Sequence, residues 1–148
     1  MNIINYNAED LIDHDAVFAI IKDKDGKILL QEHVKYDHRT LPWWKVKPGQ
    51  SLLDWLKEEI QEECNITILE AKEIINEEHI YNRDGKNIRV MEHIFEVTTF
   101  TGEIQNNEPH KHSQLLFKSL DEIQKLPHLS HVAVIYLKML GIIRPYKI

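Results

Sequence analysis

Four glutamates lie close together near the middle of the chain: Glu58, Glu59, Glu62 and Glu63. On a helix, Glu59, Glu62 and Glu63 would share one face, because residues three and four positions apart are neighbours on its surface. Gathered carboxylates repel one another, and their oxygens are the ligands that Mg²⁺ or Mn²⁺ takes together with substrate phosphates. The same spacing is equally typical of a solvated acidic helix face, so a metal site and an interaction surface of a scaffold protein are both open interpretations.

The residues before these glutamates predict the helix that would position them. Ser51 is a suitable N-cap, and Asp54 suits the positive end of the helix dipole. A Pro48-Gly49 turn leads into this start. The apolar residues that follow recur at helical spacing, at Leu52, Leu53, Leu56 and Ile60. We therefore expect a helix with one apolar stripe and an adjoining acidic face.

The stretch from Leu41 to Ile66 resembles the Nudix hydrolase signature. That signature contains a glycine, a loop glutamate, an Arg-Glu pair, an aliphatic residue, two adjacent glutamates, and then a glycine followed by an aliphatic residue. It fits this chain without a gap, and the matching positions are Glu59, Ile60, Glu62, Glu63 and Ile66. Pro42 and the Pro-Gly turn also stand where the family has them.

Four positions differ from the signature. Trp44 replaces its first glycine, Gln50 its loop glutamate, Glu58 its arginine and Asn65 its last glycine. Asn65 is the mild change, because asparagine tolerates the left-handed conformation of a helix C-cap. Glu58 is the serious one, because the family's arginine is understood to brace the catalytic carboxylates.

The resemblance implies a divalent-metal-dependent hydrolase that cleaves a diphosphate bond in a nucleoside diphosphate linked to another group, of the nucleoside triphosphate or nucleotide-sugar type. Glu59, Glu62 and Glu63 would be catalytic and would hold Mg²⁺, with Mn²⁺ as a second choice. Glu108, in a Glu-Pro-x-Lys run like one in the family, would take a proton from water as general base. The altered signature positions leave an alternative, a catalytically impaired Nudix-like module that binds a nucleotide or a partner.

The predicted substrate-binding residues are Trp43, Trp44, Lys45 and Arg89. Adjacent tryptophans in an extended segment point to opposite sides, so we expect one to pack in the core and the other to be able to stack on a base. Arg89 could reach phosphate, although a salt bridge is the commoner role of such an arginine. An isolated His-x-His at 110–112 lacks further identified ligands and is left out of the metal site.

Composition limits the partners and the location. The 148 residues predict a single domain spanning 1–148, and one cysteine excludes an internal disulfide. A net charge of −6 disfavours a nucleic-acid polymer or an anionic membrane, but not a small nucleotide whose charge a metal neutralises. No secretion signal or membrane-spanning run is evident, so the cytoplasm is the default location. The resemblance also allows a homodimer.

The remaining pattern predicts the elements around the acidic helix. Strands are expected at 15–21, 28–34, 67–78, 88–100 and 115–119. The first two should form a hairpin, a loop is expected at 36–39, a turn at 81–86, and a long loop from 105 onward. A short helical turn is expected at 120–123, and a helix at 131–140 that Ser130 caps and Gly141 ends. With the resemblance, this order implies an α/β protein with the Nudix fold, an α/β/α sandwich with a mixed sheet.

Overall fold

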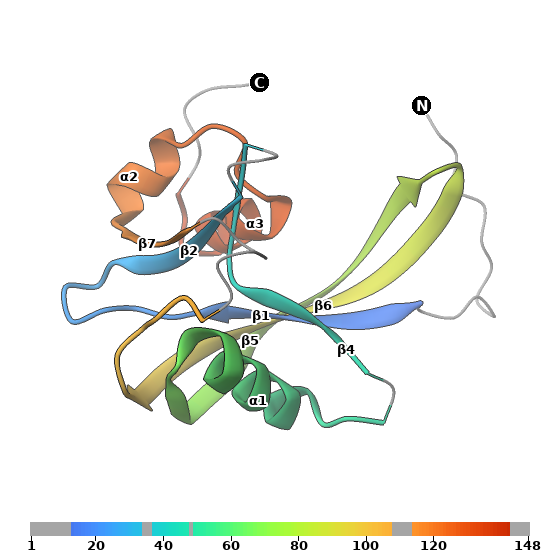
Figure 1. The fold of residues 1–148 in the computed structure, drawn as a ribbon. Helices are drawn as coiled ribbons and strands as arrows, with labels where there is room; N and C mark the ends of the chain where they lie inside the picture. The colour runs from blue at the N-terminus through green and yellow to red at the C-terminus, as the bar shows by residue number, and fades with distance from the viewer. Residues whose placement is uncertain (1–12, 34–36, 48, 108–113, 143–148) are drawn as a thin grey trace.

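The computed structural model describes residues 13–33, 37–47, 49–107 and 114–142. Its strands form two sheets, ordered β4-β1-β6-β5 and β3-β2-β7 (Figure 1). β1 runs parallel to β6, and the other pairs in these sheets are antiparallel. The elements are β1 (His14–Ile20), β2 (Ile28–His33), β3 (His38–Thr40), β4 (Trp43–Val46), α1 (Leu52–Cys64), β5 (Thr67–Arg83), β6 (Lys86–Thr101), β7 (Gln114–Lys118), α2 (Leu120–Lys125) and α3 (His131–Met139).

The four-stranded sheet lies between α1 on one face and α2 and α3 on the other (Figure 1). Alternation along β1 sends Val17 and Ala19 into the core beneath α1, and Phe18 and Ile20 into the core beneath α3. Leu56 and Ile60, from the predicted apolar stripe of α1, are fully buried in the first of these cores. The expected α/β/α sandwich with a mixed sheet is therefore confirmed.

The predicted hairpin of the first two strands is wrong in its pairing. β1 and β2 follow one another in the chain but belong to different sheets, because β4 and β6 pair with the two edges of β1. Backbone pairing beside the turn consists of an antiparallel bridge of Lys22 with Ile28 and 2.9 Å hydrogen bonds from Leu29 N to Ile21 O and from Asp23 N to Lys27 O, all beyond the last residue of β1. The turn itself is stable, since Asp23 Oδ1 accepts 2.9 Å hydrogen bonds from two backbone amides within it.

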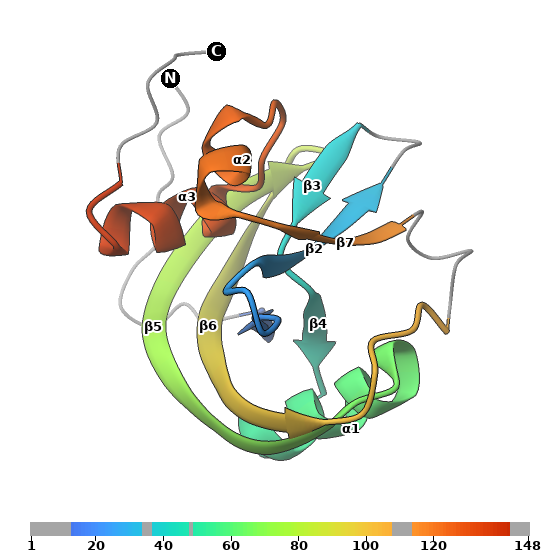
Figure 2. The ribbon, with the colours of Figure 1, turned by 90° about the vertical axis from the view of Figure 1, so that its left-hand side faces the viewer.

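The long hairpin of β5 and β6 exceeds the prediction. Both strands continue into the expected turn at 81–86, so the loop shrinks to Asp84 and Gly85, whose φ angles of 53° and 79° suit a two-residue hairpin. Figure 2 shows this hairpin curving from α3 to α1. A second difference is β3, where a loop was expected at 36–39; His38–Thr40 pairs with β2 instead.

The ends of α1 agree with the sequence. Ser51 is the N-cap, and its Oγ accepts a 3.4 Å hydrogen bond from Asp54 N. At the other end Asn65 is left-handed, with φ 64°, and its N–H reaches Gln61 O at 3.2 Å. α3 likewise begins after the Ser130 cap and ends just before Gly141. Within the described residues, no helix has both the length and the apolar character needed to cross a membrane.

Candidate active site

The two tryptophans of β4 point to opposite faces of the four-stranded sheet, as expected. β4 is an edge strand of this sheet. Trp44 faces α1 and is 8% exposed, whereas Trp43 faces the other side and is 42% exposed. Two consecutive residues of β4 therefore lie on opposite faces of the sheet, with Trp44 in the core beneath α1 and Trp43 at the cavity on the other side.

On the α1 side, Trp44 contacts one of the predicted metal ligands. Its Nε1 donates a hydrogen bond to Glu63 Oε2, and Glu63 is only 3% exposed. Glu59 is half-buried and Glu62 is exposed on the same helix. Among the described residues, Glu59, Glu62 and Glu63 do not form a group whose ligand atoms all lie within 4.8 Å of one another, so a hard cation such as Mg²⁺ would require these side chains to converge.

The chain segment after β6 crosses the C-terminal end of α1. Asn107 N donates to Glu63 O at 3.0 Å, and Asn107 Nδ2 donates to Glu62 O at 3.1 Å. Two helix-end carbonyls, which have no partner within the helix, are satisfied in this way. Glu108, the predicted general base, is the next residue and lies outside the described residues, as do His110 and His112.

The two predicted cationic residues lie in different places. Lys45 is exposed and lines a cavity of about 370 Å³ beside the turn before α1, together with Asp15 and Gln50. Arg89 is near the start of β1, where its Nη2 forms a 2.9 Å salt bridge with Glu78 Oε2. Arg89 therefore forms a salt bridge, which the sequence analysis gave as the commoner role of such an arginine.

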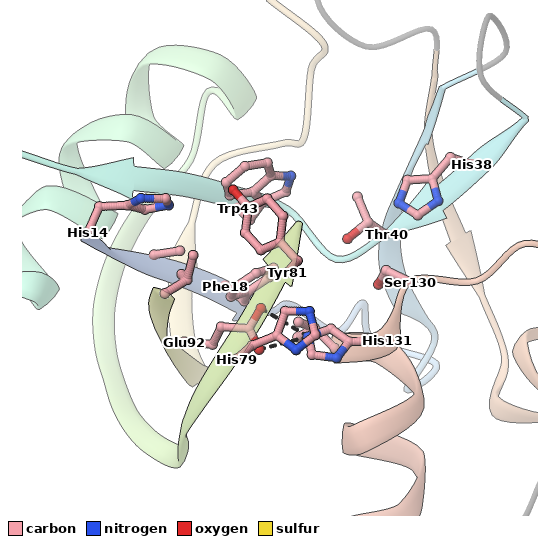
Figure 3. Close-up of a pocket in the computed structure, with 13 residues that line it drawn as sticks. His14, Phe18, His38, Thr40, Trp43, His79, Tyr81, Glu92, Ser130 and His131 are labelled. Carbon is pink, nitrogen blue, oxygen red and sulfur yellow. Dashed lines mark hydrogen bonds and ion pairs between the residues drawn. The ribbon is translucent and has the colours of Figure 1, made fainter. Parts of the chain in front are cut away.

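On the other face of the sheet, beneath Trp43, is a cavity of about 350 Å³ (Figure 3). Trp43 and Phe18 stack in its wall, with ring centroids 5.8 Å apart and ring planes at 17°. Tyr81 is a third aromatic residue of the lining, and Thr40 and Ser130 bring hydroxyl groups. This mixture of aromatic surface and a few polar groups is typical of a small-molecule site.

The floor of this cavity holds a cluster that the sequence analysis missed. His131 Nε2 lies 2.7 Å from Glu92 Oε1 and 3.0 Å from Oε2, and the His79 and His131 rings have centroids 3.9 Å apart. Burial, and then the neighbouring His131, lowers the pKa of His79 below its ordinary value. The three residues are far apart in sequence, but one signal was available: Glu92 is a charged residue at an inward-facing position of a strand.

The profile of the NUDIX domain matches residues 13–138. The chain belongs to the Nudix family. No curated protein matches it.

Solved Nudix structures share the fold. A MutT NUDIX hydrolase from Burkholderia pseudomallei is 26% identical with a TM-score of 0.71, and the match covers 84% of this chain and 95% of that one. The mutator MutT protein from Bacillus halodurans is 25% identical with a TM-score of 0.69, over 84% of this chain and 80% of that one. A C. elegans Ap4A hydrolase, 22% identical with a TM-score of 0.62 over 86% and 96% of the two chains, shares the fold alone.

The expected enzyme class, a Nudix pyrophosphohydrolase, is thereby confirmed. Two departures from the Nudix signature also acquire a physical description. Trp44 stands at the first glycine and donates a hydrogen bond to Glu63, while Asn65 stands at the last glycine and is left-handed, a conformation that glycine adopts readily. Glu58, at the arginine position, is exposed on α1.

Proposed function

We propose that this Nudix hydrolase cleaves a diphosphate bond in a nucleoside diphosphate linked to another group, with Mg²⁺ or Mn²⁺ held by Glu59, Glu62 and Glu63. The observation that carries the proposal is the adjacency of Trp43 and Trp44 on an edge strand. Trp43 lines the cavity, and Trp44 contacts Glu63. A nucleotide with its base in the cavity can pass its phosphates around the edge of β4 to the acidic face of α1.

The aromatic wall supports base binding. Trp43 is 42% exposed and rests on Phe18, so one face of a rigid stacked pair is available to a ligand. Bases stack on such rings without requiring a particular base, with about 1–3 kcal/mol per base. A cavity of about 350 Å³ suits a nucleoside, and the hydroxyl groups of Thr40 and Ser130 offer it hydrogen bonds.

The acidic helix supports a metal requirement. Phosphates cannot approach its glutamates without cations, and hard oxygen ligands favour Mg²⁺ over softer metals. Bound there, the ion would neutralise phosphate oxygens and lower the pKa of a water molecule. Lys45, exposed beside the turn before α1, would attract phosphate, whereas Arg89 is left out of the proposal because it pairs with Glu78.

Glu108 is proposed as the group that takes the proton from the attacking water. Its neighbour Asn107 is bonded to the carbonyls of Glu62 and Glu63, which brings the preceding segment to the acidic helix. A carboxylate supplied next to a hydrolytic centre can act as a general base once the water's proton is within hydrogen-bond reach. In this step a carboxylate oxygen of Glu108 accepts the proton, so Glu108 becomes a carboxylic acid and the water's oxygen is free to attack phosphorus.

The test is phosphate and pyrophosphate release from a panel of nucleoside triphosphates, ADP-ribose and nucleotide sugars, with Mg²⁺, with Mn²⁺ and with chelator. We expect turnover of at least one compound that depends on the metal, and the products identify the bond that is cut. Turnover that persists in chelator would contradict the metal assignment.

A second candidate, nucleotide binding without cleavage, is favoured by the contact that encloses Glu63. The carboxylate is 3% exposed and already accepts a hydrogen bond from Trp44, where the signature has a glycine. Failure to cleave any compound, combined with metal-dependent binding of one of them, would select this candidate over the first.

A further inference from the structure

We propose that His79, Glu92 and His131 form a binding site for a divalent transition metal such as Zn²⁺, on the opposite face of the sheet from the acidic helix. Among the described residues, these three bring their ligand atoms within 4.8 Å of one another. The site goes beyond the proposed hydrolysis and does not rest on it.

Three separate elements bring the ligands together. His79 on β5 pairs with Val90 on β6, so Glu92, two residues further along β6, is its diagonal neighbour on the same face of the sheet. His131 is the first residue of α3, and Ser130 fixes this helix start by accepting a hydrogen bond from Ala133 N at 3.2 Å. Figure 3 shows the two imidazole rings and the carboxylate converging at one side of the cavity.

The distances require little adjustment to accept a metal. Ligand atoms on a tetrahedral Zn²⁺ are about 3.4 Å apart, given bonds of about 2.0–2.2 Å. Glu92 Oε1 is 2.7 Å from His131 Nε2, which is shorter than this value, and one ligand atom from each of the three residues lies within 4.8 Å of the other two. Rotation of the His131 and Glu92 side chains would replace their direct contact with one metal bond from each residue, and His79 would supply the third ligand.

Charge and burial also favour a cation at this point. Glu92 is a carboxylate that is only 7% exposed, and such a group is costly to bury without a positive partner. The His79 and His131 rings, with centroids 3.9 Å apart, place two imidazoles beside this carboxylate. His131 is at the N-terminus of α3, where the helix dipole repels a cation, and the negative charge of Glu92 offsets this repulsion.

The donor set separates this site from the one proposed on α1. Two imidazole nitrogens and one carboxylate suit Zn²⁺, Co²⁺ or Ni²⁺, whereas Mg²⁺ prefers oxygen ligands alone. Three protein ligands leave a coordination position open, as in zinc sites that bind water or a substrate group. His131 is 40% exposed and lines the cavity, so that open position would face whatever molecule occupies the cavity.

The test is Zn²⁺ titration of the metal-free protein by calorimetry in the presence of excess Mg²⁺. A parallel titration with Co²⁺ reports tetrahedral coordination through its visible absorption. We expect one Zn²⁺ per chain, and His131→Gln or His79→Gln should raise the dissociation constant by at least about 10-fold.

The matched control is His38→Gln, because His38 lines the same cavity but lies outside the cluster, and its Zn²⁺ affinity should equal that of the unchanged protein. Circular dichroism of each variant confirms that the fold is retained, and Zn²⁺ should raise the melting temperature of the unchanged protein more than that of His131→Gln. Absence of Zn²⁺ binding, equal affinity in His131→Gln, or displacement of Zn²⁺ by Mg²⁺ would each overturn the proposal. The first of these results would mean that the cluster is only a hydrogen-bonded contact between β6 and α3.

Discussion

The indole of Trp44 on β4 donates a hydrogen bond to Glu63 on α1, so the edge strand and the acidic helix are joined through a predicted metal ligand. Glu63 is 3% exposed and Trp44 is 8% exposed, so both groups are withdrawn from water. In the Nudix signature the position of Trp44 is a glycine, which has no side chain to donate. In this chain Glu63 therefore has an internal hydrogen-bond partner that a glycine at this position could not supply.

Trp44→Phe should destabilise the metal-free protein, because it removes the donor and leaves a buried carboxylate unsatisfied. The expected loss in the free energy of unfolding is about 1–3 kcal/mol. Excess Mg²⁺ should restore part of this loss if Glu63 is a ligand, since a cation replaces the missing donor. Urea unfolding in chelator and in Mg²⁺ measures both effects.

The matched control is Trp55→Phe, which removes the 2.9 Å hydrogen bond from Trp55 Nε1 to the carbonyl of Lys45 and leaves Glu63 untouched. Its loss of stability should be the same with and without Mg²⁺. Equal recovery of both variants in Mg²⁺ would contradict a metal role for Glu63.

Glu62→Gln should lower turnover by about 100-fold or more while the fold is kept, because it removes one charge from the proposed metal site at an exposed position. Steady-state rates on whichever compound is cleaved give the comparison. Glu103→Gln makes the same charge change at another exposed site, outside α1, and should leave the rate unchanged. Full activity in Glu62→Gln would mean that the metal is held elsewhere.

Local signals in the sequence were enough to predict α1. Its start at Ser51, its end at Asn65 and its buried stripe follow from capping chemistry and helical spacing, which involve neighbouring residues alone. The tryptophan alternation was predictable for the same reason. Which of the two tryptophans is buried was not, because that depends on the register of β4 against β1, where Trp44 pairs with Val17.

Features made by distant segments escaped the sequence analysis. A turn signal such as Asp25-Gly26 shows that two strands are connected but not that they pair, and β1 pairs with β4 and β6 instead of β2. The cluster of His79, Glu92 and His131 depends on three elements meeting, so no spacing in the sequence encodes it. None of these three residues lies in the Leu41–Ile66 stretch that carries the Nudix resemblance, so the resemblance could not indicate the cluster.

Gly102→Ala should be clearly destabilising, because a Cβ there would lie 2.9 Å from the carbonyl oxygen of Asn65 at the end of α1. Gly102 also has a φ of +98°, which side chains rarely adopt. We expect a loss of more than about 1 kcal/mol in the free energy of unfolding, measured with urea.

Gly26→Ala is the matched control for this substitution. Its φ is +81°, but its Cβ would meet no atom of the described residues within 4 Å, so it suffers the backbone strain without the clash. Gly102→Ala should therefore lose more stability than Gly26→Ala. Equal losses would show that the segment at Gly102 moves away from α1 at little cost.

Trp43→Ala should weaken nucleotide binding, because it removes the exposed stacking surface of the cavity. Loss of one base–aromatic stack corresponds to roughly a 10- to 100-fold rise in KM. Trp43→Phe keeps a ring and should retain most of the affinity. Because Trp43 also stacks on Phe18, Trp43→Ala should lose some stability and Trp43→Phe less, so both variants are first shown to be folded by urea unfolding. An unchanged KM in Trp43→Ala would place the base outside this cavity.

His38 should make stability depend on pH. Burial lowers its pKa from the ordinary 6.5, and the neighbouring His33 on β2 lowers it further. A hydrogen bond with the backbone of His128 raises the pKa, whereas the charges of Arg39 and of the His128 ring lower it. The unfolded chain therefore binds more protons at this position as the pH falls through 6.5. The contribution of neutral His38 to the free energy of unfolding is therefore complete above pH 6.5, and it is lost progressively as the pH falls below this value. His38→Gln removes the titrating group, so its free energy of unfolding, measured with urea across this range, should fall less on acidification than that of the unchanged protein. Parallel curves would show that His38 has the same proton affinity in the folded and unfolded states.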